Sequence, residues 1–116
     1  MRPTVTFEPG DVVVVPFPFT DKRATKRRPA LALSDAGQFN IGHCVLAMIT
    51  SRGNADWPLD VQITDLAAAG LTAASVVRMK IFTLDNRLIL RKAGVLAKKD
   101  AKAVGHALKK LLGKSL

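Results

Sequence analysis

The chain has 116 residues, a length that fits one domain over residues 1–116 and is too short for a second domain with its own core. Its formal net charge is +9, which favours a polyanionic partner: a nucleic acid, an acidic protein or an anionic membrane. Aromatic residues make up only 5% and tyrosine is absent, which argues against an RNA-recognition module built on rows of exposed rings.

The cysteine content and the apolar runs limit where in the cell the protein is expected. Cys44 is the single cysteine, so neither an intramolecular disulfide nor a cysteine-based metal cage is available. It lies in the apolar run CVLAMI, where we expect a buried, inert thiol. The N-terminus shows no signal-peptide pattern, and the longest apolar runs are too short to cross a bilayer. We therefore expect a cytoplasmic protein without a membrane partner.

The first half of the chain has the pattern of short strands separated by turns. Pro9-Gly10 is a turn signal, and the β-branched run after it predicts a strand buried on both faces. The polar, basic stretch 18–27 predicts an exposed loop, as does the turn-rich stretch 52–58. Apolar runs between these signals predict strands at 11–17, 28–34, 43–51 and 59–63.

The second half adds helices to further strands. Residues 65–70 predict one helical turn, capped by Thr64 or Asp65 and closed by Gly70. Strands are expected at 74–83 and 87–92, with a turn at Asp85-Asn86. Residues 98–112 predict a helix with the apolar stripe Ala101, Val104, Leu108, Leu111 and Leu112. The set predicts a small, mostly antiparallel barrel with helices at its edge.

The last helix is the densest basic segment. Residues 98–116 carry a net charge of +5, because six lysines accompany a single acid. These lysines fit phosphate binding, and they fit equally a solvated face above the apolar stripe.

The stretch KRRPALALS, residues 26–34, is the most informative. Strand alternation puts Leu31 and Leu33 on one face and Arg28 on the other, at the head of a row of small residues. Pro29 biases Arg28 towards an extended backbone. A guanidinium held beside an open floor of small side chains is a plausible phosphate clamp. The alternative is a solvated arginine at a strand end.

Two adjacent hydroxyls form the second candidate. Thr50 and Ser51 close the strand CVLAMI just before Arg52, and they fit either contact with a phosphate or ribose hydroxyl or ordinary strand-end capping. Both faces of this strand are apolar, so alternation does not decide which hydroxyl faces the site. His43 and His106 are the titratable candidates, and we expect neither to be catalytic. The carboxylates are scattered, so no metal triad and no bound cofactor are expected.

Taken in order, four segments resemble the MazF/PemK family of toxins, closest to its PemK-like branch. They are GDVVVVPFPFTD (10–21), KRRPALALS (26–34), VLAMITS (45–51) and SVVRMKIFTLD (75–85) followed by RLILRKAGVL (87–96). The resemblance implies a Src-homology-3-like antiparallel barrel of the kind shared by MazF, PemK and CcdB. It also implies a homodimer, single-stranded RNA as substrate, and a cognate antitoxin that blocks the RNA groove.

The resemblance also implies a reaction and its residues. The family's catalytic arginine and threonine correspond to Arg28 and Thr50, with Ser51 as a neighbour of open role. The ribose 2′-hydroxyl attacks the adjacent phosphate, so no metal ion is required and DNA should not be cut. Five cations are the expected contacts to the RNA backbone: Lys26, Arg27, Arg52, Arg78 and Lys80.

Some features leave room for other readings. The segment before Arg28 is ATKR and lacks the Gly-Ser-Glu-Gln run of MazF, so the cleavage sequence does not carry over. A gyrase poison of the CcdB type would share the barrel without nuclease chemistry. A non-catalytic nucleic-acid-binding barrel would share the basic charge.

Overall fold

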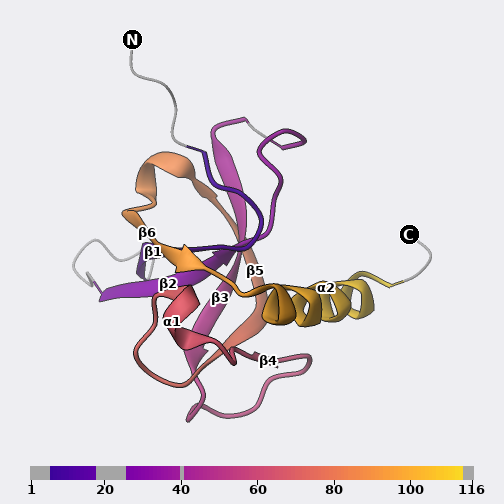
Figure 1. Ribbon diagram of the computed structural model, residues 1–116. Coiled ribbons are helices and arrows are strands. Elements are labelled where there is room, and N and C mark those ends of the chain that lie inside the picture. The colour runs from indigo at the N-terminus through magenta and orange to yellow at the C-terminus, as the bar shows by residue number, and fades with distance from the viewer. Residues whose placement is uncertain (1–5, 18–25, 40, 114–116) are drawn as a thin grey trace.

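The computed structural model describes residues 6–17, 26–39 and 41–113 (Figure 1). Most of this part of the chain lies in short strands, with a helical turn in the middle and a longer helix at the end. The elements are β1 (Asp11–Phe17), β2 (Lys26–Ala32), β3 (His43–Ser51), β4 (Val61–Gln62), α1 (Leu66–Ala69), β5 (Ser75–Asp85), a 3-10 turn (Asn86–Leu88), β6 (Arg91–Val95) and α2 (Lys98–Leu112).

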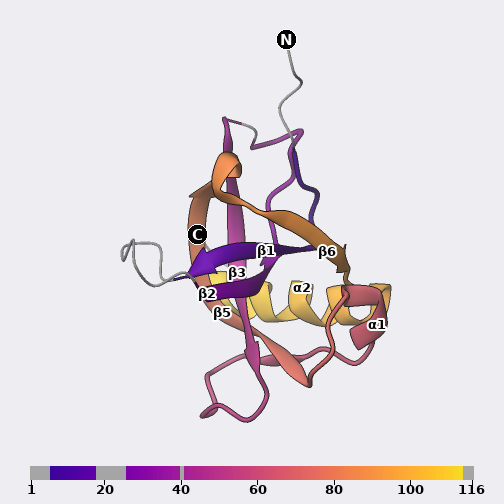
Figure 2. The same cartoon turned by 90° about the vertical axis from the view of Figure 1, so that its left-hand side faces the viewer.

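The strands form one antiparallel sheet in the order β4-β5-β3-β2-β1-β6. Figures 1 and 2 show β3 crossing β1 and β2 at a steep angle, so the sheet curls into a half-barrel with α2 alongside. The expected small antiparallel barrel with a short helix and a terminal helix is confirmed. Neither helix in the described ranges has the length and hydropathy needed to cross a bilayer.

Strand alternation builds a core on each face of the sheet. One core lies beneath the helices and includes Val12, Leu31, Ile49 and Val104. The other core includes Val13, Ala30 and Leu46, which alternate with members of the first along the same strands. β1 and β3 are therefore buried on both faces along most of their length, as their continuous apolar runs predict.

A register irregularity separates the two halves of β5. Ala47 pairs with Ile81 but Met48 pairs with Arg78, so two residues of β5 are extra at this point. The irregularity lies in β5, while β3 keeps its alternation: Ala47 and Ile49 face the first core, and Leu46 faces the second. This local change of twist directs the side chains around Arg78 and Lys80 towards the end of β3.

Asp100 fastens α2 to the rest of the fold. Its side chain is 2% exposed and accepts hydrogen bonds from Thr64 N (3.0 Å), Thr64 Oγ1 (2.7 Å) and Asp65 N (3.0 Å). Burial alone would raise the pKa of this carboxyl, but the three donors outweigh it and the pKa is lowered. Asp65 in turn caps α1 by accepting from Ala68 N, as the sequence predicts.

Glycines allow α1 to approach β6 closely. A Cβ on Gly70, which has φ +73°, would lie 2.1 Å from the carbonyl oxygen of Ala93. A Cβ on Gly94 would lie 2.4 Å from the carbonyl oxygen of Ala68. Larger residues at either position would force the helix away from the strand.

Four expected strands have different bounds; among them, the strand expected at 74–83 spans Ser75–Asp85 and the strand expected at 28–34 spans Lys26–Ala32. The strand expected at 59–63 is paired only at Val61–Gln62, because Leu59 has a left-handed backbone (φ 65°) that a strand cannot contain. The strand expected at 87–92 begins only at Arg91, because the Asp85 carboxylate accepts from Arg87 N and caps a 3-10 turn. Lys26 and Arg27 belong to β2, whereas the loop was expected to extend through them.

Two packing expectations are also wrong. Ala30 and Ala32 are 1% and 0% exposed and belong to the second core, so the row of small residues beyond Arg28 is packed and offers no open floor. On α2, Leu111 and Leu112 are 42% and 60% exposed, so the apolar stripe contacts the sheet only along the first part of the helix. Val104 and Ala107 make the buried contacts, since α2 docks by its N-terminal half.

Candidate active site

Arg28 lies in β2 at the border of the second core. It pairs with Val15 of β1, and its guanidinium carbon is 5.5 Å from the centroid of the Phe17 ring. Its Nε is buried and has no hydrogen-bond partner among the described residues. A buried donor without a partner costs free energy, so native proteins rarely keep one unless a ligand or water satisfies it.

Thr50 is on the same face of the sheet as Arg28. Ala30 pairs with Met48 across β2 and β3, and continuing this register by two residues aligns Arg28 with Thr50. Thr50 Oγ1 accepts a hydrogen bond from Asn54 Nδ2 (2.6 Å). Its own hydroxyl hydrogen therefore remains available to donate to a ligand.

Ser51 follows Thr50 in β3 and points to the other face, because strand residues alternate. It is exposed, and its Oγ accepts from Gly53 N at 3.4 Å in the turn after β3. The register thus places Thr50, and not Ser51, on the face of the sheet that carries Arg28.

The five cations expected at the site have different surroundings. Lys26 is exposed and shares the face of Arg28, while Arg27 pairs with Pro16 and points to the opposite face. Arg52 is exposed in the turn after β3. Arg78 and Lys80, two residues apart on β5, both reach the ring of Trp57.

The guanidinium of Arg78 is bound by other residues of the fold. Its side chain is 12% exposed, it forms an ion pair with Asp60 (2.9 Å), and it donates to the carbonyl oxygen of Ala55 (2.7 Å). The hydrogen bonds that Arg78 donates to the Asp60 carboxylate are the main cause of its raised pKa. Lys80, in contrast, is exposed and has no ion pair within the described part of the chain. Of these two cations, Lys80 has the freer charge.

Comparison with known proteins identifies the family of the chain. A family model described as "PemK-like, MazF-like toxin of type II toxin-antitoxin system" matches residues 8–112. The chain belongs to this family. It is thus a toxin of the PemK-like, MazF-like group, and the resemblance of its four motifs is confirmed. No curated protein matches the sequence.

Solved structures of MazF toxins share the fold of this PemK-like chain. A MazE–MazF structure from Deinococcus radiodurans aligns with a TM-score of 0.74 and 25% identity over 96% of this chain and 100% of that one. A Mycobacterium tuberculosis toxin, MazF-mt6, has a TM-score of 0.69 and 20% identity, covering 88% of this chain and 95% of that one. An endoribonuclease in complex with its cognate antitoxin, from a mycobacterial species, has a TM-score of 0.69 and 17% identity, covering 94% and 95%.

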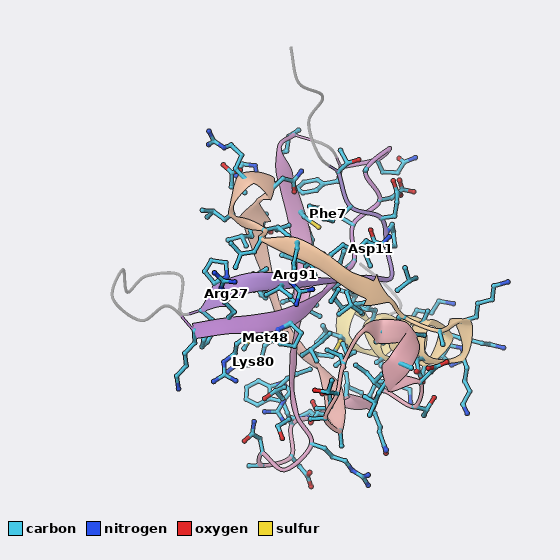
Figure 3. The ribbon with its side chains drawn as sticks, turned by 60° about the vertical axis from the view of Figure 1, so that its left-hand side comes forward. Phe7, Asp11, Arg27, Met48, Lys80 and Arg91 are labelled. Atoms are coloured by element: carbon cyan, nitrogen blue, oxygen red, sulfur yellow. The ribbon has the colours of Figure 1, made fainter. Side chains whose placement is uncertain are left out.

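A large cavity of this PemK-like toxin lies away from Arg28. It has a volume of 1120 Å³ and is lined by residues of the N-terminal segment, the start of β3, the 3-10 turn and β6, including Phe7, Asp11 and His43. Figure 3 shows Phe7 and Asp11 well away from Met48 and Lys80. Acids and bases pair there: Asp11 with Lys92 (3.2 Å) and Asp85 with Arg87 (2.8 Å). Arg87 lowers the pKa of Asp85 to about 2.

The remaining titratable candidates lie outside the site. His43 is exposed at the opposite end of β3 from Thr50, and His106 is exposed on α2. Cys44 is 3% exposed in the second core, so its expected burial is confirmed. Burial raises the pKa of its thiol, which favours the less reactive protonated form. In the part of the chain that the structure describes, no three His, Cys, Asp or Glu side chains gather in a way that could hold a metal ion.

Sequence reasoning missed two residues of this site, Asn54 and Trp57. Asn54 follows Thr50 by four positions in a Gly-Asn turn, a spacing that lets its amide fold back onto the strand end. Trp57 is 40% exposed, and it is the only aromatic side chain among the exposed large hydrophobic residues described. A single exposed tryptophan between basic strands was the signal that could have identified it.

Proposed function

We propose that this toxin is an endoribonuclease that cleaves single-stranded RNA without a metal ion. The ribose 2′-hydroxyl attacks the adjacent phosphorus and loses its proton, the bond to the 5′-oxygen breaks, and that oxygen gains a proton. The products are a 2′,3′-cyclic phosphate and a 5′-hydroxyl. Because the nucleophile belongs to RNA, DNA of the same sequence is not cut.

Arg28 supplies the main electrostatic stabilisation in this proposal. Negative charge grows on the phosphorane oxygens, and fixed donors that meet it lower the barrier by more than mobile water does. The buried Nε of Arg28, which lacks a partner among the described residues, is the single observation that best supports this role. Pro29 and the Phe17 ring limit the motion of the guanidinium, so its donors are directed before the substrate binds.

Thr50 and the neighbouring cations complete the site. With Asn54 donating to Thr50 Oγ1, the hydroxyl hydrogen is directed towards the phosphate or the 2′-oxygen. Arg28 also orients the proton that moves. Lys26, Arg52 and Lys80 contact the RNA backbone, while Arg78 positions the loop beside them and Arg27 approaches RNA from the edge of the sheet.

The partners of this toxin follow from its relatives. We propose a cognate antitoxin, because the structures it resembles include a MazE–MazF complex and an endoribonuclease bound to its antitoxin. We also propose a homodimer. Exposed apolar side chains surround the large cavity, among them Ile41 (72% exposed) and Leu90 (47% exposed), and a second copy would cover them. The RNA substrate places the protein in the cytoplasm.

The decisive experiment is RNA cleavage in the presence of a chelator. We expect wild-type scission to persist with EDTA and Arg28→Ala to lose about 10²–10³-fold in rate. Mass analysis should find cyclic phosphate ends. Intact RNA after incubation with folded wild-type protein would contradict the proposal and leave a gyrase poison or a non-catalytic binding barrel. Inhibition of gyrase in a supercoiling assay would then separate those two.

A further inference from the structure

Trp57 is an exposed aromatic ring with two cations beside it. The ring is 40% exposed, with Lys80 Nζ 4.9 Å and the Arg78 guanidinium carbon 5.7 Å from its centroid. Exposed aromatic rings beside positive charges are how many proteins bind single strands, because a base stacks on the ring and its phosphate meets the charge. A soluble toxin gains no folding free energy from leaving this much indole in water.

The loop that carries Trp57 is fixed on both sides of the ring. Trp57 N donates to Asp60 Oδ2 (3.2 Å), and the same carboxylate forms the ion pair with Arg78. Arg78 also donates to the carbonyl oxygen of Ala55, two residues before the ring. Between Trp57 and Asp60, Leu59 holds a left-handed backbone that costs a leucine free energy. A fixed ring binds a base with little loss of conformational entropy.

The ring lies beside the strand end that carries Thr50. Arg78 pairs with Met48, and Thr50 is the next residue of β3 on the same face. Met48 and Lys80 lie together beside the irregularity of β5 (Figure 3). Asn54, which donates to Thr50, belongs to the same loop as Trp57. A nucleotide next to the one held by Thr50 would therefore meet the ring.

We propose that Trp57 and Lys80 form a stacking subsite for one unpaired base of the RNA, with Lys80 bound to the phosphate of that nucleotide. The inference rests on the proposed ribonuclease function and names how the substrate is held. Stacking requires a base that is free of its helix, so the subsite selects single strands over duplexes. It also tolerates any base, because every base presents a π face.

The single tryptophan makes the subsite directly observable, since all indole fluorescence comes from Trp57. The probe is a short single-stranded RNA with 2′-O-methyl groups, which binds but cannot be cleaved. We expect its binding to quench the emission. An oligonucleotide of the same length and charge without bases should bind through the cations and leave the emission nearly unchanged.

Variants test the contribution to affinity. Trp57→Ala should weaken binding of the methylated RNA about tenfold, whereas Trp57→Phe should stay within about threefold of wild type. Binding of the abasic strand should be equal in all three proteins, which separates loss of stacking from displacement of Lys80. Leu112→Ala, at the exposed end of α2, removes a similar apolar side chain as a control.

The outcomes separate this inference from the proposed function. If wild type cleaves RNA, but binding causes no quenching and Trp57→Ala binds as tightly as wild type, the subsite is wrong and the ribonuclease stands. The proposal would also be overturned if Trp57→Ala weakened binding of the abasic strand as much as binding of the RNA. Trp57 would then affect affinity only by positioning the neighbouring cations. If wild type neither binds nor cleaves RNA, both proposals fail.

Discussion

Two charged side chains at the border of the core, Arg28 and Asp100, are held in opposite ways. Asp100 is 2% exposed, and both of its oxygens accept hydrogen bonds from Thr64 or Asp65. Arg28 packs against Phe17, but its buried Nε has no partner within the described residues. The protein thus satisfies the carboxylate completely and leaves part of the guanidinium unsatisfied.

The difference separates a charge that serves the fold from a charge that we propose serves a ligand. A buried charge that the fold satisfies contributes stability, and its removal leaves donors without partners. A buried donor that the fold leaves unsatisfied lowers stability and gains a partner only when something binds. Substitutions at the two positions should therefore have opposite effects on stability and on cleavage.

The largest expected effect is on catalysis, from Arg28→Lys. Lysine keeps the positive charge but cannot present the planar fork of donors, so we expect the cleavage rate to fall about 10²-fold. The free energy of unfolding should be unchanged or higher, because an unpartnered buried donor is removed. Single-turnover cleavage and urea unfolding measure the two. If Arg28→Lys cleaved at the wild-type rate, the planar set of guanidinium donors would not be required for cleavage.

Asp100→Ala should show the reverse pattern. Thr64 N and Asp65 N lose their acceptor, and α2 loses its attachment to the segment before α1, so the free energy of unfolding should fall by about 3 kcal/mol. Cleavage per folded molecule should stay at the wild-type value. Asp100→Asn keeps one acceptor oxygen and should lie between the two proteins. Loss of cleavage in fully folded Asp100→Ala would mean that the two regions are coupled.

Thr50→Val tests the partner of Arg28 with little change in side-chain shape. Losing the hydroxyl removes one donor to the reacting phosphate, and we expect about a tenfold fall in the cleavage rate. Thr50→Ser should recover most of it, while Ser51→Ala should have little effect, since Ser51 faces away from Arg28. If Ser51→Ala cleaved more slowly than Thr50→Val, the hydroxyl of Ser51 rather than that of Thr50 would belong to the site.

Acid should weaken the Asp100 attachment specifically. Its pKa is lower in the folded protein than in the unfolded chain, so its stabilisation is complete above about pH 4 and is lost as the pH falls through the folded-state pKa. The difference in free energy of unfolding between wild type and Asp100→Asn should narrow between pH 5 and pH 2. Measurements at intervals of ~0.5 pH unit would resolve this change. Comparing the two proteins cancels the contribution of Asp85, whose pKa is also lowered. A constant difference would contradict the assignment.

The smallest effect concerns single cations that could contact the RNA backbone. Lys80→Ala should reduce the slope of log affinity against log salt by about 0.7, the value for one phosphate contact on a single strand. Lys102→Ala, on the exposed side of α2, should leave the slope unchanged if that helix is only solvated. A similar fall for Lys102→Ala would add α2 to the RNA-binding surface.

The sequence by itself determined most of the fold. Local rules located β1, β3 and α2 at their observed bounds, and they limited the caps of α1 to Thr64 or Asp65 at its start and Gly70 at its end. A strand buried on both faces or a capped helix is specified by neighbouring residues. The same segments carried the resemblance to the PemK-like, MazF-like family. The two residues with matching family motifs, Arg28 and Thr50, were also named from the sequence.

Only the tertiary structure decided how those residues are surrounded. Alternation in β3 could not choose between Thr50 and Ser51 because both faces are apolar, and it took the pairing with β2 to show which one shares the face of Arg28. The sequence predicted open space beside Ala30 and Ala32, but in the structure both are buried in the second core. The fold also creates contacts between residues that are distant or irregularly spaced in sequence. Arg78 contacts Asp60, Trp57 contacts Lys80, and Asp100 contacts Thr64. Such contacts depend on how strands curl and pair, which no local pattern encodes.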